Sequence, residues 1–135
     1  MTYHQGRLLD HVHLRVADVA ASRRFYRAAL EAIGRLDAFD EDAHAFWADE
    51  LYVDLADGPV SHVHLAFQAR NPAQVQAFHA QAIAAGGRDN GAPGPRSYGP
   101  GYYAAFVLDP DGNNVEAVWH AGTTRSAESV VVAAG

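Results

Sequence analysis

The sequence predicts an α+β fold of two tandem βαβββ modules, which form curled mixed sheets around a cleft with the helices on the outer faces. The main observation is an internal repeat, because the tetrapeptide His-Val-His-Leu occurs at His11–Leu14 and again at His62–Leu65. Two copies of a unit of about fifty residues indicate one pseudo-symmetric domain rather than a solenoid. Each copy also ends on a carboxylate, since Tyr52–Leu55 (YVDL) aligns with Asn114–Ala117 (NVEA).

The segment after each tetrapeptide also repeats. With a two-residue insertion in the second copy, Phe25 aligns with Phe78 and Gly34 with Gly87. A matching helix and a matching terminal carboxylate make chance duplication of the tetrapeptide a poor explanation.

The first module covers about residues 8–58. It begins with a strand over Leu8–Val16, in which hydrophobic and polar side chains alternate. Asp18 is expected to cap a helix over Val19–Ile33, and Gly34 to end it. The module then closes with two short strands, Ala43–Ala48 and Leu51–Ala56.

The second module covers about residues 60–120. After a strand over His62–Ala69, Asn71 is expected to cap a helix with Pro72 in its first turn, ending near Ala85. The glycine- and proline-rich segment from Arg88 to Gly101 is expected to be an irregular loop that covers the cleft. The remaining expected elements are strands over Tyr102–Leu108 and Asn114–Trp119, a structural turn at Asp109–Gly112, and a tail, 121–135, that the sequence does not place.

Composition restricts the classes of function. The 135 residues fit one domain, and a net charge of −6 without a basic run argues against nucleic acid as a partner. The chain has no cysteine, which excludes thiol catalysis and fits a cytoplasmic location. No apolar run reaches membrane-spanning length, which argues against a membrane as a partner. The expected partner is a small-molecule substrate.

The repeat predicts where a site lies. His11 and His62 hold equivalent positions, as do Asp54 and Glu116, and a pseudo-twofold axis would gather them in one cleft. Imidazole and carboxylate together suit a borderline divalent ion such as iron, manganese, nickel or zinc. We therefore predict that His11, His62 and Glu116 bind a metal, and that Glu116 or Asp54 moves a proton. The alternative for Asp54 is a turn residue.

Other polar residues are expected on the same face. His13 and His64 are candidates for substrate contacts or for a general base, with plain strand packing as the alternative. Arg15 could bind a substrate carboxylate or form an internal ion pair. The late loop and the strand after it supply four more candidates for lining the cleft, or for a lid without specific contacts: Arg96, Tyr98, Tyr102 and Tyr103.

Three segments resemble the vicinal oxygen chelate superfamily, which includes glyoxalase I, extradiol dioxygenases, fosfomycin-resistance transferases and bleomycin-binding proteins. They are DHVHLRVADVAASRRFY, SHVHLAF and FVLDPDGNNVEAV, and the resemblance extends over about residues 8–120. It implies paired βαβββ modules, a homodimer, and metal ligands at His11, His62 and Glu116. It also places the additional glutamate of glyoxalase I on Asp54 and its glutathione-contacting arginine on Arg15.

The chain departs from glyoxalase I at two positions. Asp54 replaces a glutamate, and Gly58 stands where that enzyme has an asparagine. We therefore expect glutathione hemithioacetals to be poor substrates. The resemblance implies a small metal-dependent lyase or isomerase, with a small dioxygenase or a non-catalytic antibiotic-binding protein as alternatives.

Overall fold

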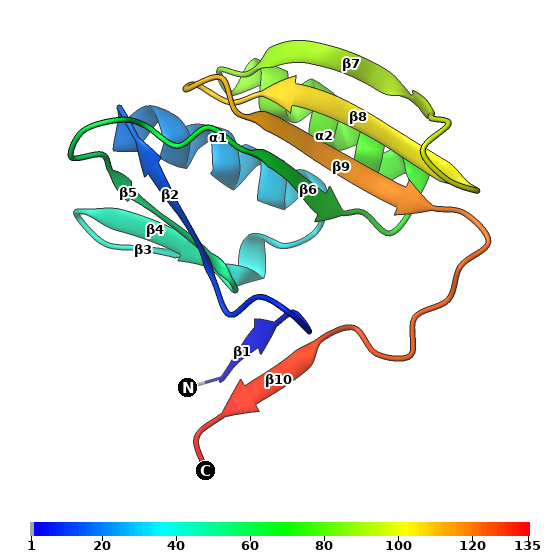
Figure 1. Ribbon diagram of the computed structural model, residues 1–135, viewed down its shortest axis with the longest axis horizontal. Helices are drawn as coiled ribbons and strands as arrows, with labels where there is room; N and C mark the ends of the chain where they lie inside the picture. The colour runs from blue at the N-terminus through cyan, green and yellow to red at the C-terminus, as the bar shows by residue number, and fades with distance from the viewer. Residues whose placement is uncertain (1) are drawn as a thin grey trace.

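The computed structural model describes residues 2–135. Its first module forms a four-stranded sheet of order β2-β5-β4-β3, with one helix between the first and second strands of the module (Figure 1). The elements of this module are β2 (Val12–Val16), α1 (Val19–Ala32), the short 3-10 helix η1 (Leu36–Ala38), β3 (Phe39–Glu41), β4 (Ala45–Ala48) and β5 (Leu51–Leu55).

The second module repeats this plan as a sheet of order β6-β9-β8-β7. Its elements are β6 (His64–Gln68), α2 (Pro72–Ala84), β7 (Arg88–Pro95), β8 (Tyr102–Leu108) and β9 (Asn114–His120). In each module the first strand pairs in parallel with the last, and the other pairs are antiparallel. The predicted α+β fold of two tandem βαβββ modules is therefore confirmed.

Both helices begin where the sequence predicts. The Asp18 carboxylate accepts a hydrogen bond from the backbone N–H of Ala21, and the Asn71 side chain accepts one from the N–H of Gln74. Each cap therefore satisfies one of the free N–H groups in the first helical turn. Gly34 follows α1 with φ +73°, a conformation that glycine adopts without steric cost.

The segment from Arg88 to Gly101 differs from the expectation of an irregular loop. Its first eight residues form β7, the edge strand of the second sheet. The pairing with β8 shifts register between Asp89 and Gly91 and again between Gly91 and Gly94. Glycine and proline are tolerated in a strand where it is an edge and bulged, which explains why their abundance did not prevent pairing.

The helices lie in one core between the two sheets. Tyr26 on α1 contacts both sheets, since its ring centroid is 6.0 Å from that of Phe46 on β4 and 6.4 Å from that of Phe67 on β6. Beside α2, a Cβ added at Gly87 would meet Phe25 of α1 and Val107 of β8. Figure 1 shows α1 between the sheets and α2 behind β8 and β9.

This arrangement corrects one expectation. Each helix covers one face of its sheet, but the opposite faces, which carry the predicted site residues, point away from the shared core. Within residues 2–135 the helices thus lie in the shared core and not on the outer faces, and the two modules do not enclose the expected cleft between these faces.

The ends of the chain pair with each other. β1 (Thr2–Gln5) and β10 (Val130–Ala133) form a separate two-stranded antiparallel sheet. The part of the tail that the sequence left unplaced thus returns to the N-terminus, at the lower edge of Figure 1. Within residues 2–135 no helix is long and apolar enough to cross a membrane.

Candidate functional site

The first sheet carries a histidine–carboxylate pair on its open face. His13 Nε2 lies 2.7 Å from Asp54 Oδ1, and Arg15 Nε lies 3.4 Å from the same oxygen. Parallel pairing of β2 with β5 places Arg15 opposite Asp54, so the three side chains share one face. We call His13, Arg15 and Asp54 the first half-site; each is about one-third to one-half exposed.

A shallow hollow adjoins the first half-site. It has a volume of about 430 Å³, and its lining includes His11, His13, Trp47 and Tyr52. The rings of Trp47 and Tyr52 are stacked at 6.2 Å with an interplanar angle of 13°, and His13 meets Tyr52 edge-on at 5.1 Å. These rings could bind a flat apolar group beside the imidazole.

The second sheet carries the equivalent pair. His64 Nε2 lies 2.8 Å from Glu116 Oε1, and the Tyr102 hydroxyl donates a hydrogen bond to Glu116 Oε2. Glu116 is only 1% exposed, while His64 is 52% exposed. We call His64, Glu116 and Tyr102 the second half-site. A buried carboxylate needs such partners, because leaving its oxygens without them would be costly.

Tyr102 keeps its proton over a wide pH range. Burial, together with the hydrogen bond to Glu116 and the charge of that residue, raises the pKa of Tyr102 to about 12. Its hydroxyl is therefore a permanent donor at neutral pH. The sequence suggested Tyr102 only as one of several cleft-lining aromatics; its hydrogen bond follows from its position on β8, next to the strand that holds Glu116.

The structure separates the four predicted histidines into two pairs, one that contacts the carboxylates Asp54 and Glu116 and one that does not. His11 lies just before β2, exposed, with Nδ1 2.7 Å from Asp10 Oδ1, and His62 is exposed just before β6. The imidazoles that contact the carboxylates are instead His13 and His64, two residues further along each strand. Residues two apart on a strand face the same side, so the sequence alone could not choose between the two histidines of each copy.

The residues predicted in the late loop and in the strand after it do not all lie on the same face of the second sheet. Arg96 lies over Phe106 at 5.4 Å, but its guanidinium donates to the backbone carbonyls of Ala92, Gly94 and Pro95, so it holds the bulged strand. Tyr98 is 70% exposed and packs edge-on against Tyr102 at 5.3 Å, adjoining the second half-site.

Tyr103 lies on the helix side of the second sheet. Its hydroxyl accepts a hydrogen bond from Gln76 Nε2 on α2 at 3.0 Å, and its ring packs against the core. The alternation of side chains along β8 thus separates it from Tyr102 and from the second half-site.

Each half-site has side chains of the types that bind a metal ion, but too few of them to hold one. One imidazole and one carboxylate are ligands that zinc, iron, manganese or nickel accept. Within residues 2–135, however, no three histidine or acidic side chains come close enough to hold an ion.

The fold and the site define a paired-module α+β protein with equivalent histidine–carboxylate pairs on two sheets. Comparison with known families gives the class: residues 8–117 match the Glyoxalase/Bleomycin resistance protein/Dioxygenase superfamily. The chain belongs to this superfamily.

Solved structures agree with this assignment. The chain is similar to a glyoxalase/bleomycin resistance protein from Albidiferax ferrireducens T118, with 30% identity, a TM-score of 0.72, and coverage of 83% of this chain and 98% of the other. It also resembles in fold a glyoxalase-related enzyme from Fulvimarina pelagi, at 20% identity and a TM-score of 0.70, covering 96% and 99% of the two chains. A comparison with curated proteins gave no significant match.

Proposed function

We propose that the protein is a small metal-dependent enzyme of the glyoxalase-like type, which binds adjacent oxygens of a small molecule on a divalent ion. One observation carries the proposal: His13–Asp54 and His64–Glu116 are equivalent pairs, 2.7 and 2.8 Å apart, on the open faces of two equivalent sheets. Superfamily membership supports it, because the family includes glyoxalases and dioxygenases by its own description.

The proposed site forms between two copies of the chain. Because both helices pack in the core that the two sheets share, the half-sites on the opposite sheet faces of one chain point away from each other. A twofold axis would bring the first half-site of one copy against the second half-site of its partner, twice in each dimer. The ligands would come from the predicted set His11, His62 and Glu116, or from their strand neighbours His13 and His64.

The roles of the remaining side chains follow from their contacts. A bound divalent ion would act as a Lewis acid on the chelated oxygens. Glu116 or Asp54 would take and return a proton in a lyase or isomerase reaction. Tyr102 would donate a hydrogen bond, and Arg15, on the open face of the first sheet, would pair with an anionic group of the substrate.

A mixing experiment tests this arrangement. A His11→Ala, His13→Ala double variant removes both candidate imidazole ligands of the first module, and a Glu116→Ala variant removes the carboxylate ligand of the second half-site. If each site uses both copies, an equal mixture after subunit exchange contains heterodimers with one intact site, giving about a quarter of the wild-type metal content. Neither variant alone should bind metal. Light scattering before mixing checks that both variants are dimers.

Two outcomes would overturn the proposal. A clean monomer at micromolar concentration would remove the shared site, and full metal occupancy after His11, His13, His62 and His64 are all replaced by Ala would exclude every proposed imidazole ligand. Full occupancy in the His11→Ala, His62→Ala double variant alone would assign the ligation to His13 and His64. Metal analysis of wild-type protein purified without added metal or chelating resin provides the reference for both.

The substrate of glyoxalase I is not expected to be turned over well. Gly58 has no side chain to hold glutathione where glyoxalase I has an asparagine. It is exposed in a turn with φ +111°, and no atom lies within 4 Å of an added Cβ, so no neighbouring side chain replaces the missing one. Metal-loaded protein that converted methylglyoxal plus glutathione at a typical enzyme rate, about 10 per second, would contradict this expectation.

A second candidate function is the binding of a small molecule without catalysis. The stacked Trp47 and Tyr52 at the hollow favour it, because they offer a flat apolar surface next to His13. Ligand binding that persists unchanged after complete metal removal would favour this function over the enzyme.

A further inference from the structure

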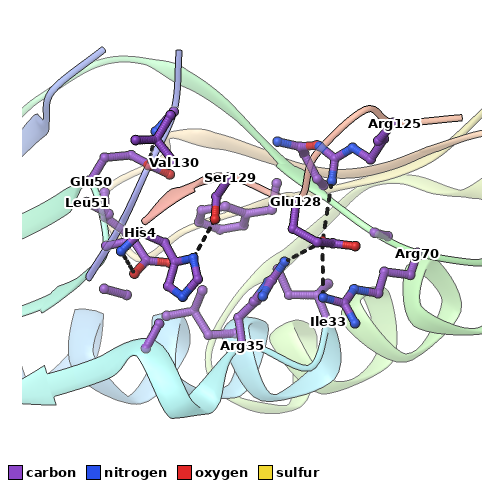
Figure 2. Close-up of a pocket in the computed structure, with 18 of the residues that line it drawn as sticks. His4, Ile33, Arg35, Glu50, Leu51, Arg70, Arg125, Glu128, Ser129 and Val130 are labelled. Carbon is purple, nitrogen blue, oxygen red and sulfur yellow. Dashed lines mark hydrogen bonds and ion pairs between the residues drawn. The ribbon is translucent and has the colours of Figure 1, made fainter. Parts of the chain in front are cut away.

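A second hollow lies on the core side of the molecule; no residue of either half-site lines it, although Asp49 and Leu51 line both hollows. It has a volume of about 470 Å³ and lies beneath the tail, residues 125–130 (Figure 2). Part of its lining is apolar and comes from both modules: Leu30 of α1, Ile33 just after α1, Leu51 of β5 and Phe67 of β6. A volume of this order is ordinary for a small-molecule site.

Three arginines converge on one carboxylate at the edge of this hollow. Glu128 Oε2 lies 3.3 Å from Arg70 Nη2, 3.5 Å from Arg35 Nη2 and 4.0 Å from Arg125 Nη1. The arginines come from three separate segments: Arg35 after α1, Arg70 before α2, and Arg125 in the tail. Figure 2 shows the three guanidinium groups around the single Glu128 side chain.

The charges around Glu128 are unbalanced. Three guanidiniums face one carboxylate in a chain whose net charge is −6 and which has ten arginines and no lysine. Glu128 is 62% exposed, and Arg70 is 55% exposed, so each ion pair is screened by water and holds the tail only weakly.

The opposite wall of the hollow limits the charge of a ligand. Asp49 and Glu50 line it together with Arg7, and the two carboxylates accept hydrogen bonds from the backbone N–H groups of His4 and Gly6 at 3.3 and 3.0 Å. A second negative charge on a ligand would meet these carboxylates. An anion with one charge at the arginine end and an apolar remainder fits both walls and the apolar lining.

We propose that this hollow is a second binding site, for a small carboxylic acid with an apolar body, and that Glu128 occupies its carboxylate position until the ligand displaces it. The arginines Arg35, Arg70 and Arg125 bind the carboxylate of the ligand, and the apolar lining takes its hydrocarbon part. The site is independent of the proposed metal centre, because none of its arginines belongs to either half-site.

Calorimetric titration of the full chain with octanoate tests this site. Octanoate is expected to bind, whereas 1-octanol, which lacks the charge, and inorganic phosphate, which lacks the apolar body, bind at least about tenfold more weakly. Glu128→Gln should strengthen octanoate binding by about three- to tenfold, because it removes the competing carboxylate. Arg70→Gln and Arg35→Gln should each weaken it by a similar factor.

A charge-matched control tests whether the loss of any arginine has the same effect on octanoate binding. Arg88→Gln removes an exposed arginine on β7, outside the hollow, and should leave the affinity for octanoate unchanged. No octanoate binding, equal binding of octanol or phosphate, or equal effects of Arg70→Gln and Arg88→Gln would each overturn the proposal. An affinity unaffected by Glu128→Gln would show that the tail carboxylate does not occupy the site.

Discussion

The two modules share one order of strands and helix, but their carboxylates, Asp54 and Glu116, differ in burial and in their partners. Asp54 in the first module is 30% exposed and pairs with His13 and Arg15, whereas Glu116 in the second is 1% exposed and pairs with His64 and Tyr102. The histidine–carboxylate pair is therefore common to both half-sites, and the third partner is a cation in one and a hydroxyl in the other.

Strand register explains the difference. Asp54 lies between Arg15 on β2 and Ala45 on β4. The same position in the second sheet places Glu116 between Ala66 on β6 and Phe106 on β8. Phe106 excludes water from Glu116, whereas Ala45, at the matching position beside Asp54, is too small to do so. On the other side, Arg15 extends into solvent beside Asp54, whereas Ala66 beside Glu116 cannot.

The comparison suggests a division of work between the half-sites. The second is fixed by burial and by a permanent hydrogen-bond donor, so it suits a defined metal ligand. The first is open and contains the half-exposed Arg15, so it suits contact with a variable, anionic part of a substrate. Four comparisons of variants test how the two modules differ, and they are taken from the largest expected effect to the smallest.

The largest effect is expected at the turn between β8 and β9, the part of the second module that contacts α1. The Asp109 carboxylate is buried and accepts hydrogen bonds from the Tyr26 hydroxyl at 2.7 Å and from Asn113 N–H at 2.8 Å. Asp109→Ala should lower the free energy of unfolding by about 3 kcal/mol, because it leaves buried donors without acceptors. Urea denaturation measures the change.

The control for this turn lies in the first module. Asp57 is exposed in the turn after β5, and Asp57→Ala should change the free energy of unfolding by less than about 0.5 kcal/mol. A loss below 1 kcal/mol for Asp109→Ala, on the order of an ordinary surface substitution, would contradict a structural role for this turn.

The next variant pair compares the carboxylates directly. Glu116→Ala should destabilise the fold by about 2 kcal/mol, since it strands the Tyr102 hydroxyl and leaves a cavity. Asp54→Ala should cost less than about 1 kcal/mol, because its partners remain hydrated. Both are measured by urea denaturation with a chelator at fixed protein concentration, and equal losses would remove the asymmetry.

Tyr102 gives a smaller effect with a pH signature. Tyr102→Phe should cost about 1 kcal/mol at neutral pH. The pKa of Tyr102 is raised to about 12 in the folded chain, above its ordinary value, so the stability from this contact is complete below about pH 10 and is lost as the pH rises through about 12. Ultraviolet titration at alkaline pH should lose one tyrosine ionisation near 12 in Tyr102→Phe.

An exposed tyrosine in the first module is the control. Tyr52 is 37% exposed, and Tyr52→Phe should leave the ionisation near pH 12 in place. If the two phenylalanine variants had the same alkaline titration, the hydroxyl of Tyr102 would not be held by Glu116.

The smallest effect is expected for Arg15, the partner found only in the first half-site. Arg15→Gln should change the free energy of unfolding by less than about 0.5 kcal/mol, because the side chain is 46% exposed. Its effect should appear in substrate affinity instead. Arg24→Gln, on an exposed position of α1, is the charge-matched control for both measurements.

Local sequence signals predicted most of the elements. Asp18 and Asn71 mark both helix starts correctly, and Tyr102–Leu108 has the predicted bounds, because caps and alternation act over a few residues. β7 was missed because its glycines and prolines indicate a loop, and only pairing with β8 along a bulged edge makes it a strand.

For the site, the sequence by itself determined the repeat, the two faces that carry histidine and carboxylate, and the equivalence of Asp54 with Glu116. Only the tertiary structure decided that His13 and His64 are the contacting imidazoles, that Tyr102 faces Glu116, and that both helices lie between the sheets. The physical reason is that a period of two fixes the face of a side chain but not its neighbours. Those depend on strand register and on which apolar faces pack together, and both are set by residues far apart in the chain.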